Sequence, residues 1–355
     1  FFKKYLNIIK SKNIKIIFQN TLDKRVFSFL NKLELNVIEL KDFTNFNINK
    51  SFSIQVFKDS FYDSSLILKV KNKVIFNLND CPIKNNKFLN SLKKKFGKCD
   101  ILLTQFSYAA WKGGEKNISW RQKSAKEKLE TMYTQSKILE AKIVIPFASF
   151  IYFSHKMNFY LNDCANKPND VIKFMDNSDS KVVFLQPYEI QYFETIEQNK
   201  ESLDFWNRLY NSIPNLKINS FDNISFNELS ENFEKYKSNI FNKNSYTLIK
   251  LIKMIPFLNA FQKLNIEIID LNTTVSLDLF QPLKLNDNND VDIKMHSSSL
   301  NFIFKNEFGY DTLTVNGCFE EIKKGSFIKM SKTLAIGSLN ALGIKIDYLF
   351  FLNLK

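Results

Sequence analysis

The chain has 355 residues, of which 45% are hydrophobic, so it can form one large domain or two ordinary ones with buried cores. Its formal net charge is +14, yet its only arginines are Arg25, Arg121 and Arg208. Specific recognition of bases and phosphates favours the arginine fork, so this charge does not indicate a specific nucleic-acid partner. The charge can raise the local concentration of a small anionic substrate, and a lysine-driven nucleic-acid binder with little sequence preference is the alternative.

Targeting and redox signals are few. The sequence contains no long apolar run and no signal-peptide pattern, so we expect no membrane span and a cytoplasmic location; nothing in it indicates an oligomeric state. Four cysteines are widely scattered without a CxxC pair, which argues against a zinc knuckle and a disulfide framework. With only two histidines, His155 and His296, an all-histidine metal site is also excluded.

Residues 14 to about 185 alternate between strand-like and helix-like segments, which predicts sheet layers covered by helices. The expected helices are Phe2–Lys10, Leu22–Leu33, Lys87–Phe96, Ser119–Leu139 with Ser119 as its N-cap, and Asn169–Asn177. The expected strands are Lys15–Gln19, Asn36–Leu40, Ser53–Phe57, Leu66–Val70, Val74–Leu78, Asp100–Leu103, Ala141–Pro146 and Lys181–Leu185.

The second half of the chain has a different pattern. Residues 198–265 read as helical, and strand-like runs return at Ile266–Leu271 and Thr274–Phe280, separated from the rest by a polar turn at Lys284–Asp290. Residues 309–317 resemble a hairpin, and Ser331–Leu352 an apolar helix. We therefore expect a domain over residues 1–197, a helical connector over 198–245 and a smaller α+β domain over 246–355.

Three polar residues stand beside predicted strands, where α/β proteins collect ligand groups. Asp80 ends the strand Val74–Leu78, Asp63 precedes the hairpin, and His155 closes a long apolar and aromatic run. Two carboxylates and one imidazole suit a hard or borderline divalent metal, but they are too few for a closed site. The alternatives are a turn-initiating aspartate and a structural histidine packed among aromatic rings.

A glycine-containing loop is the next candidate. Lys112 is followed by two glycines and preceded by Tyr108 and Trp111, so these three residues are predicted to contact substrate, with the loop backbone near an oxyanion. An ordinary surface turn is the alternative, because the spacing of a phosphate-binding loop is absent. The serines lack a GxSxG context, and His296 before Ser297 reads as a helix start. No catalytic residue is assigned.

Four segments occur in an order typical of one family. They are DSSLIL (63–68), NLNDC (77–81), DILLTQFS (100–107) and IPFAS (145–149), the last leading to His155. Together they resemble the metallo-β-lactamase-fold domain of CMP-N-acetylneuraminate hydroxylase and its relatives, in the branch that includes ascorbate-6-phosphate lactonase-like proteins. The resemblance covers about residues 1–195. It implies an αββα sandwich that lacks its first strands here, followed by the small α+β domain.

The resemblance also implies a metal site. In that family metal ions lie at the strand ends; Asp80 matches the family's late aspartate, His155 its last histidine, and Asp63 falls near another ligand position. The bound metal would be Zn²⁺, or alternatively Fe, polarising a substrate oxygen and lowering the pKa of water to about 7. The HxHxDH motif has no counterpart in this sequence and would precede Phe1, as would any Rieske iron–sulfur domain.

Two main functions follow from these observations. The first is a metal-dependent enzyme acting on an anionic sugar or nucleotide-sugar-like metabolite, as a hydrolase or a hydroxylase-like monooxygenase. The second is a non-catalytic fragment or degenerate homologue that serves as a binding module. Residues 300–317 also resemble sterol-carrier-like α+β domains, which suggests an apolar ligand for the C-terminal part; an ordinary packed domain is the alternative.

Overall fold

The computed structural model describes residues 2–21, 24–59, 63–79, 81–286 and 290–348. The chain divides into two compact units, each assembled from three stretches of sequence. Unit 1 comprises Phe1–Tyr108, Lys123–Phe150 and Ala165–Pro214, and unit 2 comprises Ala109–Gln122, Ile151–Cys164 and Asn215–Lys355. The predicted domain limits at 197 and 245 remain a prediction.

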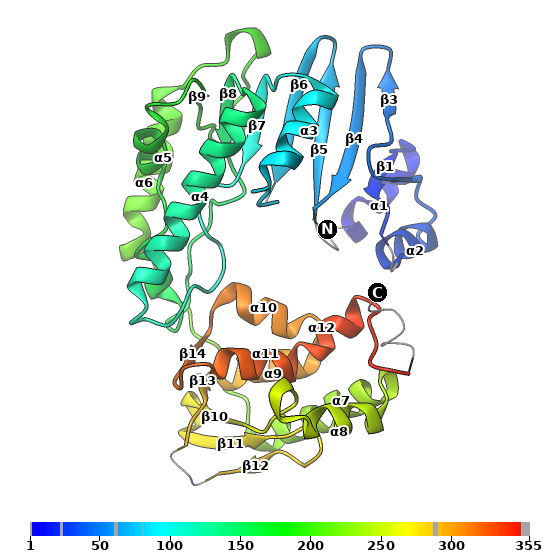
Figure 1. Cartoon of the computed structure of the whole chain (residues 1–355), viewed down its shortest axis with the longest axis vertical. Helices are drawn as coiled ribbons and strands as arrows, with labels where there is room; N and C mark the ends of the chain where they lie inside the picture. Colours follow the sequence, from blue (N-terminus) through cyan, green and yellow to red (C-terminus); the bar gives the residue numbers. More distant parts are fainter. Residues whose placement is uncertain (1, 22–23, 60–62, 80, 287–289, 349–355) are drawn as a thin grey trace. The chain divides into compact units, whose positions relative to one another are not determined.

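Unit 1 contains a seven-stranded mixed sheet in the order β3-β4-β5-β6-β7-β8-β9 (Figure 1). The strands β3 to β6 are antiparallel to one another, and β6 to β9 are parallel. Their bounds are β3 Phe46–Asn49, β4 Phe52–Lys58, β5 Ser64–Val70, β6 Lys73–Asn79, β7 Ile101–Thr104, β8 Ile143–Pro146 and β9 Lys181–Val182. A separate parallel pair is formed by β1 (Ile16–Gln19) and β2 (Val37–Leu40).

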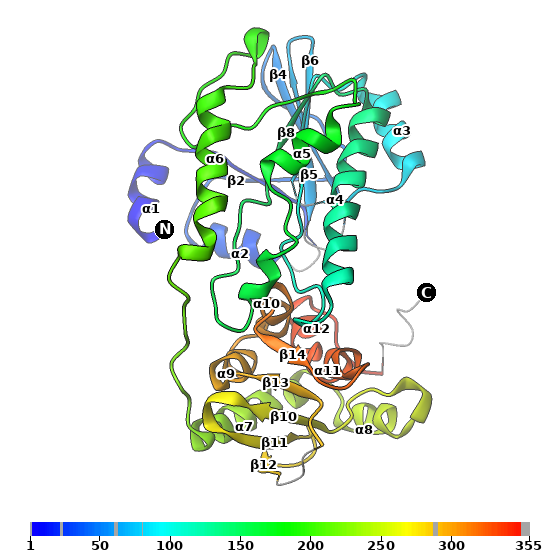
Figure 2. The ribbon, with the colours of Figure 1, turned by 90° about the vertical axis from the view of Figure 1, so that its left-hand side faces the viewer.

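The helices of unit 1 are α1 Phe2–Ser11, α2 Arg25–Lys32, α3 Asn86–Phe96, α4 Ile118–Leu139, α5 Pro168–Met175 and α6 Lys200–Ser212. The division between the units falls inside α4, after Gln122. Figure 2 views the seven-stranded sheet close to edge-on, with α3 and α4 on one side and α1 on the other.

Alternating side chains bury both faces of this sheet. In β5, Ile67 packs into the core with α3, α4 and α5, whereas Leu66 and Leu68 face the β1–β2 pair. In β4, Phe57 joins the helix side and Val56 the opposite side. Because successive side chains of a strand point to opposite faces, apolar residues at neighbouring positions require cover on both sides. The predicted mixed α/β class, with helix-on-sheet and sheet-on-sheet packing, is confirmed.

Unit 2 is built around a five-stranded sheet in the order β12-β11-β10-β13-β14, with α9, α10, α11 and α12 gathered along one side of it (Figure 1). The strands are β10 Leu264–Ile268, β11 Thr273–Leu277, β12 Lys284–Leu285, β13 Ile293–Met295 and β14 Phe319–Glu321. The helices are α7 Phe226–Lys243, α8 Tyr246–Met254, α9 Ser297–Lys305, α10 Gly309–Asn316, α11 Ser326–Leu334 and α12 Ile336–Ala341. No helix among the described residues is long and apolar enough to cross a bilayer.

The predicted hairpin at residues 309–317 is wrong, because this segment forms the helix α10. Tyr310 and Leu313 are both buried, and their spacing of three residues suits one face of a helix, not one face of a strand. Gly317 ends the helix at a φ of +69°, the left-handed conformation that glycine adopts at helix ends. Burial of this face outweighs the strand preference of the neighbouring threonines and valine.

Several other boundaries differ from the predictions. The helix α4 begins at Ile118, so Ser119 lies in its first turn and is not the N-cap. The predicted helix Ser331–Leu352 is divided into α11 and α12 at Ala335, and residues 349–352 lie outside the described residues. The strand predicted at Lys181–Leu185 is only two residues long, and β3 was not predicted.

Candidate functional site

The carboxyl ends of β6, β7 and β8 meet at one edge of the sheet in unit 1, because these strands are parallel and adjacent. β6 ends at Asn79, whose backbone has a φ of +50° and whose N–H donates to Asn77 Oδ1 at 3.0 Å. The pairing of β6 with β7 is irregular between these two residues. Asp80, the predicted metal ligand that is next in the sequence, lies outside the described residues.

Two aspartates, Asp59 and Asp63, lie at the same edge, on either side of the β4–β5 connection. β5 runs antiparallel to β6, so its amino end, just after Asp63, lies beside the end of β6. Across the β4–β5 connection, Asp59 N–H donates to the carbonyl oxygen of Asp63 at 3.1 Å. Burial raises the pKa of Asp59, and the charge of Asp63 raises it further. Two carboxylates therefore lie together next to the end of β6.

Sequence reasoning identified Asp63 but missed Asp59. The signal that would have found it is the pairing of Lys58 with Ser64, which brings the residues on either side of the loop together. That pairing depends on the register of two strands. The register follows from the alternating burial of β4 and β5.

Buried polar residues support the strand ends behind this edge. Thr104 Oγ1, at the end of β7, donates to Gln135 Oε1 of α4 at 2.7 Å. After β8, Ser149 Oγ accepts from the backbone N–H groups of Phe106 and Ser107, both at 3.1 Å. Lys128 of α4 donates to Gln105 Oε1, which places an ammonium group beside the end of β7. Such contacts hold the edge in one conformation.

The predicted substrate-contacting residues are all well packed. Tyr108 belongs to unit 1 and is 1% exposed. Trp111 belongs to unit 2 and is surrounded by aromatic rings, with centroid distances of 4.7 Å to Phe319 and 4.6 Å to Phe327. Lys112 is half-buried in the same unit. Their role in binding substrate remains a prediction.

The glycine-containing loop after Lys112 is fixed, not flexible. Arg121, 1% exposed, donates to the carbonyl oxygens of Gly114 at 2.6 Å and Glu115 at 2.9 Å. Gly114 N–H donates to Asn117 Oδ1 at 2.9 Å, so this amide is already occupied. A side chain at Gly113, whose φ is +85°, would also lie 2.6 Å from Asn117 Cβ. These contacts fit the alternative interpretation, in which the loop is a structural turn.

His155 lies in unit 2 and is 5% exposed. Its ring stacks on Phe221 with a centroid distance of 4.0 Å, and the ring of His296 lies 6.3 Å away. Met157 N–H donates to His155 Nδ1 at 3.2 Å, which leaves the hydrogen of the neutral ring on Nε2. Nε2 has no hydrogen-bond partner among the residues that the structure describes. In this orientation the ring presents an N–H donor, not the lone pair that a metal needs.

His296 is the N-cap of α9, as its position before Ser297 predicted. Its Nδ1 accepts from Ser298 N–H at 3.2 Å. Its proximity to His155 was not predictable, because more than a hundred residues separate the two.

Burial lowers the pKa of His155, and the charge of His296 lowers it further. The folded-state pKa therefore lies below the unfolded value of 6.5, and the folded state favours the neutral ring. We expect unit 2 to have its full stability above that value and to lose stability as the pH falls through the window below it. Urea midpoints at about pH 7.5 and about pH 5 test this expectation. The urea midpoint of the wild type should fall more between these pH values than that of His155→Phe. An equal fall in both proteins would contradict a role of His155 in this pH dependence.

The described residues do not by themselves complete a metal site. Within them, no group of three or more His, Cys, Asp or Glu side chains is arranged to hold a metal ion. The edge supplies Asp59 and Asp63, which are oxygen ligands, whereas a protein-bound zinc ion takes at least three protein ligands. The metal roles of Asp63, Asp80 and His155 remain predictions.

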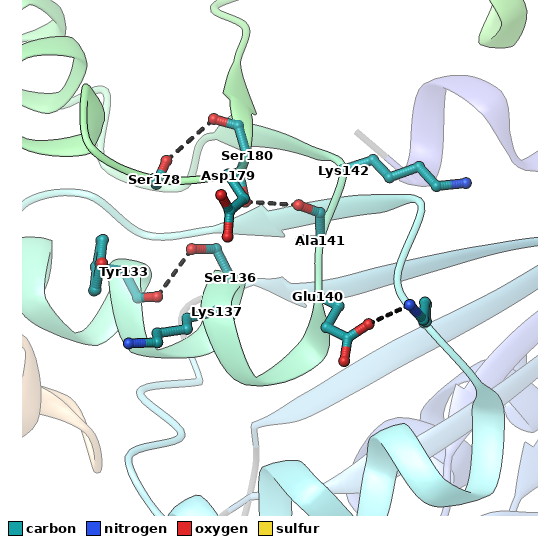
Figure 3. A pocket seen from close by; sticks show the side chains of 10 residues that line it. Tyr133, Ser136, Lys137, Glu140, Ala141, Lys142, Ser178, Asp179 and Ser180 are labelled. Atoms are coloured by element: carbon teal, nitrogen blue, oxygen red, sulfur yellow. Dashed lines mark hydrogen bonds and ion pairs between the residues drawn. The ribbon is translucent and has the colours of Figure 1, made fainter.

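A cavity of about 460 Å³ lies at the opposite edge of the sheet, at the amino ends of β7, β8 and β9 (Figure 3). Glu140 binds Lys98 at 2.6 Å and Lys93 at 2.9 Å, and these contacts lower its pKa to about 2. Ser136 and Ser180 donate their hydroxyl hydrogens to backbone carbonyls. The lysines lie near the carboxyl ends of α3 and α4, where cations are stabilised by the helix dipole. The ion pairs and helix ends thus explain the charged residues of this cavity without a bound ligand.

No family model matches this chain, and no curated protein matches it. Among solved structures, it is similar to CmlA, a diiron β-hydroxylase from Streptomyces venezuelae, with a TM-score of 0.30, 10% identity, and coverage of 44% of this chain and 34% of that one. For a mutant of CmlA the TM-score is 0.32 and the identity 9%, with coverage of 47% of this chain and 35% of that one. The third structure is that of a protein from Thermotoga maritima described as a Zn-dependent hydrolase of the metallo-β-lactamase superfamily. Its TM-score is 0.25 and its identity 16%, with coverage of 42% of this chain and 73% of that one. The chain spans about a third of the length of the CmlA structures. These similarities do not assign it to a family.

Proposed function

We propose that unit 1 belongs to a metal-dependent enzyme of the metallo-β-lactamase type. The observation that carries the proposal is the pair Asp59 and Asp63 at the sheet edge where β6 ends and Asp80 follows. The order of the four sequence segments supports it, since each of them begins or ends a strand of one continuous sheet. Neighbouring strand ends of this kind commonly hold ligands.

The proposed substrate is an anionic sugar or nucleotide-sugar-like metabolite, as in CMP-N-acetylneuraminate hydroxylase and the hydrolases of the same fold. The ammonium group of Lys128 beside Gln105 supports an anionic group at this edge, as does the net charge of +14. Asp63 and Asp80, with Asp59 beside them, are the proposed ligands for Zn²⁺ or Fe. His155 is left out of this set, because it belongs to unit 2 and its ring presents an N–H donor. Because the chain has only two histidines and no HxHxDH motif, the proposal requires further ligands beyond these residues.

Titration calorimetry of this chain with Zn²⁺, and with Fe²⁺ under anaerobic conditions, tests the site. We expect weak binding that Asp63→Asn and Asp80→Ala each weaken by about tenfold or more, because each removes a ligand oxygen. Asp179→Asn, which changes a carboxylate at the opposite edge, is the matched control and should leave the affinity unchanged. Equal affinities in all three variants would overturn the proposal and favour the non-catalytic binding module.

Asp59→Asn is expected to change thermal stability and metal affinity in opposite directions. The pKa of Asp59 is raised in the folded state, so folding disfavours the ionised carboxylate. The ionised carboxylate therefore lowers the stability of the protein, and this loss is complete above the folded-state pKa. We expect Asp59→Asn to raise the thermal midpoint at neutral pH, and the gain to vanish as the pH falls below the unfolded value of 3.8. Zn²⁺ affinity should fall in the same variant. A lower midpoint at neutral pH would contradict this account of the carboxylate pair.

A further inference from the structure

The segment that follows β9 has an inverted pattern of side chains. Tyr188, Ile190 and Tyr192 alternate along it and are 100%, 81% and 75% exposed, whereas Glu189 and Gln191 between them are half-buried and hydrogen-bonded. An extended segment beside a folded core normally buries its apolar side chains and exposes its polar ones. We call Tyr188, Ile190 and Tyr192 the apolar stripe.

The backbone that carries the stripe is firmly held. The carboxylate of Glu189 accepts from Gln186 N–H at 3.1 Å, from Gln191 Nε2 at 2.7 Å and from the hydroxyl of Ser202 on α6. Trp206 Nε1, also on α6, donates to the carbonyl oxygen of Leu185 at 2.9 Å. The exposure of the stripe is therefore fixed by these contacts.

Tyr188 also occupies an unfavourable backbone conformation. It is the third residue of a turn in which Glu189 N–H donates to the carbonyl oxygen of Gln186 at 3.2 Å, and its φ is +69°. Glycine or asparagine adopts this conformation at much lower cost. A fully exposed tyrosine gains no packing in exchange, and strain of this kind is concentrated at functional positions. The turn thus presents an aromatic ring at a cost to folding.

The segment that carries and follows the stripe is acidic, although the chain is strongly positive and the ammonium group of Lys73 lies 5.1 Å from the ring centroid of Phe193. Residues 185–204 include five carboxylates and one lysine, in a chain with a net charge of +14. Glu194 and Glu201 are exposed, and Glu197 pairs with Lys181 at 3.2 Å. A symmetric contact between two copies would place these carboxylates against each other, which is unfavourable. The charges complement a basic partner instead.

The area of the stripe indicates a transient contact. Two tyrosines and an isoleucine present roughly 500 Å² of side-chain surface. A stable interface buries about 800 Å² on each partner. Patches of a few hundred Å² on a monomer commonly mark interaction sites.

We propose that the apolar stripe binds an extended, basic and apolar peptide segment of a partner protein. The exposed rings of Tyr188 and Tyr192 and the side chain of Ile190 contact its apolar residues. The carboxylates of Glu194 and Glu201 face its lysines or arginines. This site is independent of the proposed metal-dependent activity.

Fluorescence anisotropy with two labelled peptides tests the proposal on the full chain. One peptide alternates leucine with lysine, and its match alternates leucine with glutamate. We expect only the leucine–lysine peptide to bind, and Ile190→Ser to raise its Kd at least about fivefold. Phe257→Ser removes an aromatic ring that is 83% exposed in unit 2, and it should leave the Kd unchanged.

Tyr188→Gly distinguishes loss of contact from loss of folding. Glycine relieves the positive φ, so the thermal midpoint should not fall, while the Kd of the leucine–lysine peptide rises at least about fivefold. Equal binding of both peptides, or an unchanged Kd in Tyr188→Gly and Ile190→Ser, would overturn the proposal. A concentration-dependent dimer abolished by Ile190→Ser would overturn it in favour of a second copy.

Discussion

Arg121→Met is expected to lower the free energy of unfolding of unit 2 by about 3 kcal/mol. The guanidinium is 1% exposed and forms two hydrogen bonds with Asp163, from Nε at 2.9 Å and from Nη2 at 2.7 Å. It also donates to the carbonyl oxygens of Gly114 and Glu115 and lies 5.0 Å from the ring of Tyr160. Methionine fills part of the volume but leaves these acceptors without their donor.

The charge of Arg121 changes the pKa of its partner Asp163. Burial raises the pKa of Asp163, but the hydrogen bonds and the charge of Arg121 outweigh burial and lower it overall. Arg121→Lys keeps a positive charge and loses the planar fork, so it should recover only part of the stability. A full recovery by lysine would show that charge alone accounts for the effect.

The measurement needs a signal confined to unit 2. Trp111 and Trp120 both lie in that unit and Trp206 lies in unit 1, so urea unfolding is followed by tryptophan fluorescence in a Trp206→Phe background. Lys235→Met is the matched control, because Lys235 is an exposed residue of the helix α7 in the same unit. Its effect should stay within about 0.5 kcal/mol. Similar losses in both variants would contradict the structural role of Arg121.

The sequence predicted unit 1 well because its signals are local. The β5–β6 hairpin around Lys71 and the parallel strands after it have continuous apolar runs separated by helical patterns, so their order and direction follow directly. The helix α10 was not predictable in the same way. Its threonines and valine favour strand, and only burial of Tyr310 and Leu313 against other elements selects the helix.

The candidate site was predictable only in part. Asp63 and Asp80 could be named because each adjoins a strand, and local sequence identifies strand ends. Asp59 depends on the strand register, and the packing of His155 against Phe221 and His296 depends on contacts between distant segments. Periodicity contains no information on such contacts. Sequence reasoning therefore found candidate ligands without showing which of them lie together.

Phe76→Ala is expected to lower the free energy of unfolding of unit 1 by about 3–5 kcal/mol. Phe76 is in the middle of β6, has no exposed surface and packs edge-to-face against Phe96 of α3 with a centroid distance of 6.0 Å. Its replacement leaves a cavity between the sheet and its helices that a close-packed core cannot fill. Hydrogen exchange of peptides from β5, β6 and β7 reports this loss directly.

The same variant connects the core of unit 1 to the proposed metal site. β6 ends three residues after Phe76, at Asn79, so a loosened β6 should displace the carboxylates at the sheet edge as well as lower stability. We expect Phe76→Ala to weaken Zn²⁺ binding by about tenfold under conditions where the protein is still folded. Ile48→Ala, at an exposed position of β3, should change stability by no more than about 0.5 kcal/mol and leave Zn²⁺ affinity unchanged. If Phe76→Ala kept the wild-type affinity despite its lost stability, the metal would be held by groups that do not depend on β6, and Asp80 would not be among its ligands.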